Sequence, residues 1–77
     1  MIKRTNKLLS VIIPAYKAEM FVKKNLISVI EVLNQIRYPY EVICVVDGEV
    51  DRTFEKAKKV EKLFPDKIKV VGYKKNL

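Results

Sequence analysis

The sequence predicts an α/β fold, in which a parallel sheet of three strands is joined by two helices in the order β-α-β-α-β. Short apolar runs alternate along the chain with segments whose apolar residues recur every three or four positions, and this alternation is typical of βαβ units. Each connection between apolar runs is long enough for a crossover, so the strands are expected to be parallel. Right-handed crossovers in a Rossmann-like sheet of order 3-2-1 place both helices on one face.

The strands are expected at residues 8–13, 41–46 and 67–73. The first reads L-L-S-V-I-I and is ended by Pro14, and the second reads E-V-I-C-V-V. Both are apolar on both faces, which is typical of parallel strands with helices on each side. The third alternates Lys67 and Lys69 with apolar residues, which indicates an edge strand.

The helices are expected at residues 19–36 and 52–64, because apolar residues there fall on one helical face. The apolar positions are Val22, Leu26, Val29, Ile30, Leu33 and Ile36 in the first helix, and Phe54, Ala57, Val60 and Phe64 in the second.

Two helices on one side leave the other face of the predicted sheet bare, and the first strand lies at an edge although its sequence looks central. The whole chain has 77 residues, one small domain at most. We therefore interpret residues 1–77 as the incomplete N-terminal part of a larger, three-layer domain. An uncovered apolar sheet face would allow the chain to self-associate.

Composition excludes several classes of protein. One cysteine and no histidine exclude an internal disulfide framework and a structural zinc site. No apolar stretch is long enough to span a bilayer, and the N-terminus lacks a signal-peptide core, so a cytoplasmic protein is expected.

The net charge of +7 raises the question of nucleic-acid binding. However, residues 41–51 hold four of the nine acidic residues and no basic one. The sequence contains no nucleic-acid-binding motif, and acidic loops have the wrong sign for phosphate backbones, so no nucleic-acid partner is expected.

Two loops carry the candidate binding residues, because ligands of open parallel sheets bind beyond the carboxyl ends of the strands. Residues 14–17 offer the ring of Tyr16, and residues 47–51 offer the carboxylates of Asp47, Glu49 and Asp51. A ring and carboxylates suit a nucleoside better than a bare phosphate. With two glycines in the chain, neither glycine-rich phosphate-binding motif is present.

Each of these residues also has a purely structural interpretation. Asp51 would serve as a helix N-cap, Asp47 with Gly48 as turn chemistry, and Tyr16 as a packing residue. Glu49 would be a solvated loop charge. Cys44, in mid-strand, is expected to be a small buried hydrophobe.

Two motifs resemble those of a known family. L-S-V-I-I-P-A-Y and, after a helix, E-V-I-C-V-V-D-G-E-V-D-R-T resemble the N-terminal part of the family 2 glycosyltransferases with the GT-A fold. Those proteins usually carry S-V-I-I-P-x-Y-N-E and, about thirty residues further on, V-D-D-G-S-x-D-x-T. The segment K-V-V-G-Y-K-K-N-L resembles the family's third strand and the asparagine that follows it, so the resemblance extends over nearly the whole chain.

The resemblance implies a nucleotide-binding site. Its residues would be Pro14, Ala15 and Tyr16, which line the base pocket in the family, together with Asp47, Gly48, Glu49 and Asp51. Thr53 matches the last letter of D-x-T but receives no separate role.

The sequence also departs from the family pattern. Lys17 stands where asparagine is usual and Ala18 where glutamate is frequent, while Val46 replaces the first aspartate and Glu49 the serine. Without that first aspartate, Asp47 or Glu49 would have to make its contact with the base.

The resemblance further implies that the parent protein transfers a sugar from a UDP- or GDP-sugar to an acceptor. A divalent metal, Mg²⁺ or Mn²⁺, would assist departure of the diphosphate. The family's metal-binding D-x-D and catalytic base lie further along than Leu77, so this chain alone is expected to hold no metal, to have no catalytic residue and to be inactive. The full-length parent could act at the cytoplasmic face of a membrane.

The alternative is a stand-alone, non-catalytic α/β module that binds or interacts with other molecules. The coding sequence after Leu77 would distinguish the two, because a glycine-rich stretch and a further acid-x-acid triplet would indicate the enzyme.

Overall fold

Strands and helices alternate in the computed structural model, which describes residues 2–4, 8–48 and 50–73. The elements are β1 (Ile2–Arg4), β2 (Leu9–Ala15), α1 (Val22–Leu33), β3 (Tyr40–Asp47), α2 (Thr53–Leu63) and β4 (Ile68–Tyr73). From β2 onward this is the expected β-α-β-α-β order, and the α/β fold class is confirmed.

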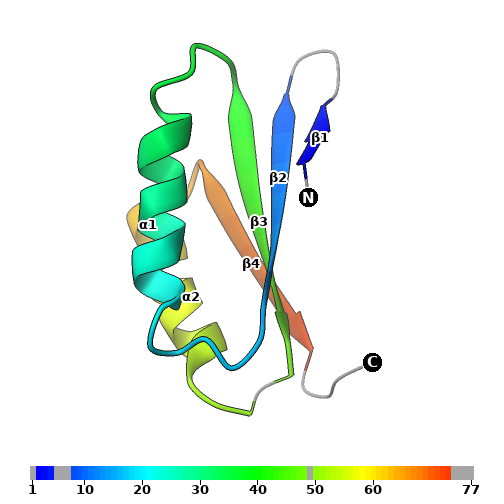
Figure 1. Cartoon of the computed structure of the whole chain (residues 1–77), viewed down its shortest axis with the longest axis vertical. Coiled ribbons are helices and arrows are strands. Elements are labelled where there is room, and N and C mark those ends of the chain that lie inside the picture. Colours follow the sequence, from blue (N-terminus) through cyan, green and yellow to red (C-terminus); the bar gives the residue numbers. More distant parts are fainter. Residues whose placement is uncertain (1, 5–7, 49, 74–77) are drawn as a thin grey trace.

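The four strands form one sheet in the order β1-β2-β3-β4, and β2, β3 and β4 are parallel. The register runs from Leu9↔Tyr40 to Ala15↔Val46 between β2 and β3, and β4 pairs with β3 from Ile68 to Tyr73. The order expected for the three parallel strands is therefore confirmed. All three end at the lower end of the molecule in Figure 1.

The N-terminal strand β1 was not predicted. It runs antiparallel to β2 and pairs with Leu9–Val11, so β2 is not an edge strand over these residues, contrary to expectation. A strand of three residues is too short to show a period in the sequence. Its pairing depends on the free backbone groups of β2 rather than on a pattern of its own.

β2 continues through Pro14, where the sequence predicted its end. Pro14 pairs in register with Val45, and Ala15 with Val46. Proline fits in a strand where its missing N–H has no partner in the ladder. The pairing of β1 with β2 reaches only as far as Val11. At Pro14, therefore, no described strand lies on the outer edge of β2 that would need an N–H from this residue.

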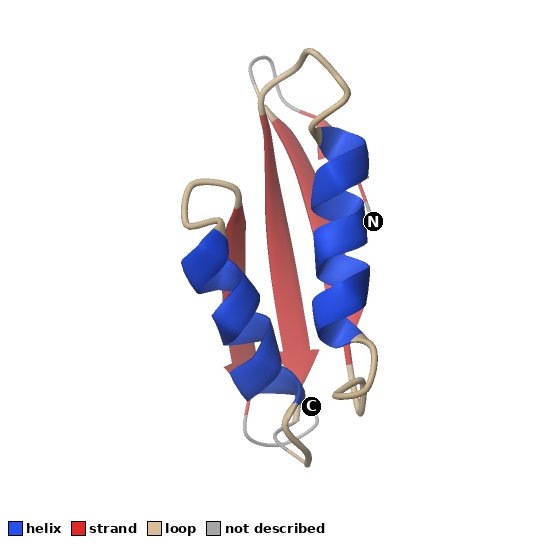
Figure 2. Ribbon diagram, turned by 90° about the vertical axis from the view of Figure 1, so that its left-hand side faces the viewer, coloured by secondary structure: helices blue, strands red, loops and turns tan. Residues whose placement is uncertain are grey.

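Both helices cover the same face of the sheet (Figure 2). On that face β3 contributes Val42, Cys44 and Val46, all with no exposed surface. The helices contribute Val22, Leu26 and Ile30 from α1 and Ala57 and Val60 from α2. Phe54 and Phe64, predicted on the apolar side of α2, pack against this core as partly buried residues.

The opposite side of the sheet, called here the open face, has no helix in the described part of the chain. By the alternation of the strands it carries Ile12, Ile43, Val45, Val71 and Tyr73. Ile43 and Val45 are half-buried, whereas Val71 and Tyr73 are exposed by 41% and 45%. The uncovered apolar face that the sequence indicated is present.

The first helix is shorter than predicted at both ends. It begins at Val22, whose N–H donates to the carbonyl of Ala18, rather than at Glu19. After Leu33 the α-helical hydrogen bonding gives way to a tighter turn, in which the N–H of Ile36 donates to the carbonyl of Leu33, three residues back. Ile36 is 39% exposed and lies outside the apolar side of α1, so its assignment to that side was wrong.

Candidate functional site

The loops that follow β2 and β3 lie at the same end of the sheet (Figure 1). Ala15 pairs with Val46 in the register, so Tyr16 and Asp47 are the next residues on two neighbouring strands. These two predicted site residues therefore lie level with each other at the carboxyl edge.

The β2–α1 loop presents an exposed aromatic ring. The side chain of Ala15 is buried, whereas Pro14 is exposed and Tyr16 is 45% exposed. The ammonium nitrogen of Lys17 lies 5.4 Å from the centroid of the Tyr16 ring, within the range of a cation–π contact. Lys17 itself has φ of 48°, in the left-handed region that side chains other than Asn, Asp and Gly rarely adopt.

Asp47, the last residue of β3, has one carboxylate oxygen without a partner in the described residues. Oδ1 of Asp47 is buried and has no hydrogen bond within the described part of the protein. Gly48 follows with φ of 87°, which glycine adopts without strain, and its N–H donates to the carbonyl of Tyr73 at 3.0 Å. A buried acceptor without a donor is costly, so Asp47 has an unused capacity to accept a hydrogen bond. Glu49 lies outside the described residues.

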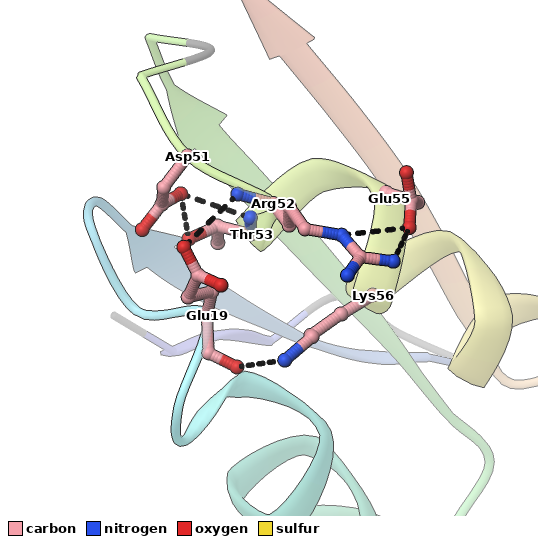
Figure 3. Close-up of polar contacts among 6 residues, drawn as sticks. All are labelled: Glu19, Asp51, Arg52, Thr53, Glu55 and Lys56. Atoms are coloured by element: carbon pink, nitrogen blue, oxygen red, sulfur yellow. Dashed lines mark hydrogen bonds and ion pairs between the residues drawn. The ribbon is translucent and has the colours of Figure 1, made fainter.

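Thr53 connects the two loops, and Figure 3 shows its contacts with Asp51. Its side chain is 1% exposed. Its hydroxyl oxygen accepts a hydrogen bond from the backbone N–H of Ala18 at 2.8 Å and donates one to Oδ1 of Asp51 at 2.5 Å. The N–H of Thr53 also donates to the same Asp51 oxygen at 2.9 Å. Asp51 thus accepts the backbone N–H of Thr53, the first residue of α2. The N-cap position itself is Arg52, which makes no side-chain cap hydrogen bond, so the predicted N-cap at Asp51 was one residue too early.

A second set of contacts joins the loops through Glu19 (Figure 3). The ammonium group of Lys56 donates to the backbone carbonyl of Glu19 at 3.1 Å, and the N–H of Arg52 donates to the Glu19 carboxylate at 3.5 Å. The Arg52 guanidinium also pairs with Glu55, at 2.5 Å for the shorter contact. Since the Arg52 and Glu55 side chains are more than half exposed, this ion pair contributes little to stability.

The electrostatics follow from these contacts. The hydroxyl of Thr53, followed by the N–H groups of Thr53 and Glu19 and the charge of Lys17, lowers the pKa of Asp51. Asp51 is therefore ionised at neutral pH and acts only as an acceptor. By contrast, burial raises the pKa of the Cys44 thiol to about 11, so Cys44 remains a protonated thiol in the core, as predicted.

The described residues gather no group of three His, Cys, Asp or Glu side chains that could hold a metal ion. The divalent metal implied for the parent protein therefore has no matching set of ligands in this part of the chain. That this chain alone binds no metal stays a prediction.

The structure also identifies a contributor that sequence reasoning missed. Thr53 was matched to a motif letter, but its buried position and its bond to Ala18, 35 residues away, have no signal in the local sequence. The only indication was a hydroxyl residue on the side of a helix that otherwise faces the core.

The parallel sheet with its helices and the loops beyond the strand ends define a Rossmann-like α/β protein. The chain matches the family model described as Glycosyl transferase family 2 over residues 10–77. This protein therefore belongs to glycosyltransferase family 2, as the resemblance implied. No match was found among curated proteins or solved structures. Neither helix in the described ranges is long and apolar enough to cross a membrane.

Proposed function

We propose that this chain binds the nucleotide of a nucleotide-diphosphate sugar, the donor in a glycosyl transfer by the full-length parent. The observation that carries the proposal is the buried oxygen of Asp47, which has no hydrogen bond to any described residue. It lies one step beyond the β2–β3 pairing and level with the exposed ring of Tyr16. Membership of glycosyltransferase family 2 makes a UDP- or GDP-sugar the expected ligand.

Each site residue has a role in this proposal. The ring of Tyr16 stacks on the base, and Pro14 and Ala15 line the pocket beside it. Asp47 accepts a hydrogen bond from a base N–H or a ribose hydroxyl. Gly48 keeps the loop backbone close to the ligand. The carboxylates of Glu49 and Asp51 are the remaining acceptors in the proposed set.

A buried side chain at position 46 supports the assignment of the base contact to Asp47. Val46 replaces the first aspartate of the family pair, and it is fully buried toward the helices. The side chain of Asp47 points to the opposite face of the strand. Among the described residues, it is the carboxylate at this level of the sheet that could take over the contact of the missing aspartate.

Nuclear magnetic resonance with uridine and guanosine diphosphate tests the proposal. The expected result is that signals of residues 14–17 and 46–49 move first, with a dissociation constant of about 1 mM or weaker, equivalent to about 4 kcal/mol. The double variant Tyr16→Ala/Asp47→Asn should lose these shifts and keep a dispersed, folded spectrum. Phe21→Ala removes another exposed ring of the same loop and should bind as the wild type does.

A different pattern of shifts would contradict the proposal. If the shifts gather on residues 56–62 and on the basic termini, charge alone holds the ligand and the base pocket is not formed by these residues.

As a second part of this proposal, the chain alone does not catalyse sugar transfer. The general base and metal ligands that glycosyl transfer requires are expected in other parts of the parent. Transfer or hydrolysis of UDP- or GDP-sugars, with Mg²⁺ or Mn²⁺ present, should therefore stay at the level of a heat-inactivated control. Turnover above that control would contradict this part.

The open face supports a second property, self-association of the isolated chain. The exposed Val71 pairs in register with Val45, while Tyr73 pairs with Asp47 and Lys69 with Ile43. Exposed apolar surface such as that of Val71 and Val45 drives association. Sedimentation should give a mass that rises with concentration. Val71→Lys should reduce that rise, whereas Val32→Lys, at a residue of α1 that is 63% exposed, should not.

A further inference from the structure

The two loops of the candidate site are held together by one buried side chain, that of Thr53. Ala18 lies two residues after Tyr16, and Asp51 lies four residues after Asp47. The hydroxyl of Thr53 bonds to both Ala18 and Asp51. Each loop is therefore fixed to the same atom, close to the residue that it would present to a base.

The direction of these bonds is determined by the charge of Asp51. An ionised carboxylate only accepts hydrogen bonds, so the hydroxyl proton of Thr53 points to Asp51. A lone pair of the same oxygen is then free to accept the N–H of Ala18. Burial of Thr53, which is 1% exposed, keeps water from replacing either partner.

The backbone beside this connection needs external support. Lys17, between Tyr16 and Ala18, has φ of 48°, a conformation that persists for such a residue only where surrounding contacts impose it. The bond from Ala18 to Thr53 is such a contact, since it fixes the residue immediately after Lys17. Without it, the chain is free to relax at Lys17 and to change the direction of Tyr16.

We propose that Thr53 is a positioning residue for nucleotide binding, whose hydroxyl holds the β2–α1 loop against the β3–α2 loop and so sets the separation of Tyr16 and Asp47. The inference rests on the proposed function. It assigns to the threonine of the D-x-T motif a role in shaping the base pocket.

The test compares four variants with the wild type. Thr53→Val keeps the size of the side chain and removes both hydroxyl bonds, whereas Thr53→Ser keeps the hydroxyl. Val60→Ala removes volume from the same helix at a fully buried position and leaves the hydroxyl connection intact, so it controls for loss of stability. Asp51→Asn changes the connection from its other end in case Thr53→Val does not fold.

The first measurement is the amide spectrum without ligand. The Ala18 signal should move to higher field and its hydrogen exchange should quicken in Thr53→Val, with Tyr16 shifting as well. Asp51→Asn should also move the Ala18 signal, both through Thr53 and through the N–H of Glu19, which bonds to Asp51 directly. An unchanged Ala18 amide in both variants would overturn the inference.

The second measurement is titration with uridine diphosphate. Thr53→Val should bind about tenfold more weakly, the equivalent of one lost hydrogen bond, while Thr53→Ser should stay within about twofold of the wild type. Val60→Ala should unfold at lower urea concentration and yet bind as the wild type does. Equal weakening in Thr53→Val and Val60→Ala would overturn the inference, because stability alone would then explain the loss.

The two proposals fail in different ways. If the wild type shows no binding with uridine or guanosine diphosphate, the proposed function is wrong. If the wild type binds and Thr53→Val binds equally well despite a displaced Ala18 amide, the nucleotide site stands and the positioning role of Thr53 is wrong.

Discussion

Along β3, Val42, Cys44 and Val46 face the two helices with no exposed surface, whereas Ile43 and Val45 between them face the other way and stay half-buried. The side chains on the two faces belong to the same apolar class. The difference lies in what covers them, because α1 and α2 lie on one side only (Figure 2). Apolar character therefore identified the strand, and the hand of its crossover connections decided which face became the core.

The two faces also differ in how they connect to the rest of the molecule. The helix-covered face is tied to α2 by side chains as well as by packing, since the Glu61 carboxylate accepts the N–H of Val70 in β4 at 2.7 Å. The open face has a hydrogen bond of its own from Ser10 to Glu41, but this bond joins two strands and adds no second layer. We therefore expect the covered face to carry most of the stability.

Substitution in the covered core should have the largest effect. Leu26→Ala, at a residue 1% exposed on α1, should lower the free energy of unfolding by about 2–5 kcal/mol through lost burial and a cavity. Val71→Ala, on the open face, should lower it by about 1 kcal/mol or less. Urea unfolding followed by circular dichroism measures both, and equal losses would show that the two faces contribute alike.

A smaller effect is expected where β4 approaches α2. A Cβ atom on Gly72 would lie 2.7 Å from Cδ1 and 2.9 Å from Cε1 of Phe54, closer than carbon atoms pack. Gly72→Ala should therefore destabilise the protein by about 1–3 kcal/mol through overpacking.

The double variant Gly72→Ala/Phe54→Leu should recover part of that loss in the same urea experiment. If Gly72→Ala alone is neutral or stabilising, the ring of Phe54 has room to move away, and the contact between β4 and α2 is not tightly packed.

The elements that could be predicted are those with enough residues to show a period. Both helices and the three parallel strands met that condition, and the positions of Tyr16 and Asp47 followed from where their strands end. β1, with three residues, is too short to show a period. Pro14 predicted the end of β2, but the strand continues through it, because the outer edge of β2 at this point requires no N–H donor. The ends of α1 were also predicted wrongly. Local turns near Ala18 and Ile36 replace the first and the last turn of the predicted helix.

Contacts made by single polar atoms could not be predicted. The bond of Thr53 to Ala18 spans 35 residues, and that of Glu61 to Val70 spans nine. Either side chain would look the same in the sequence if it were solvated. That Oδ1 of Asp47 has no partner among the described residues was equally unpredictable, because it depends on which groups the fold brings near it.

Acid should remove one of the contacts of the covered face. The N–H of Val70, with a further contribution from Lys58, holds the pKa of Glu61 below its usual value. A carboxyl with a lower pKa in the folded than in the unfolded state adds stability at neutral pH, and this stability is lost as the pH falls through the folded value.

Glu61→Gln should therefore cost about 1 kcal/mol at pH 7, because it replaces a charge-assisted hydrogen bond by a neutral one. The difference from the wild type should shrink as the pH falls through the lowered pKa of Glu61. Urea unfolding across this pH range measures it. Lys62→Gln, one residue further along α2, should leave the wild-type profile unchanged, and a pH-independent difference for Glu61→Gln would contradict the prediction.

The smallest effect is expected at the loop end of the sheet, where the backbone is strained rather than supported by the core. Lys17 has φ of 48°, and asparagine adopts this left-handed conformation more readily than lysine. Lys17→Asn should therefore raise the free energy of unfolding by about 0.5 kcal/mol, the relief of strain being partly offset by the lost contact with the Tyr16 ring. The matched change Lys24→Asn, at an exposed position of α1, should lower it by a similar amount, because asparagine is a weaker helix former than lysine. Opposite signs in urea unfolding would locate strain at Lys17, whereas a loss of stability in both variants would mean that the loop tolerates lysine without strain.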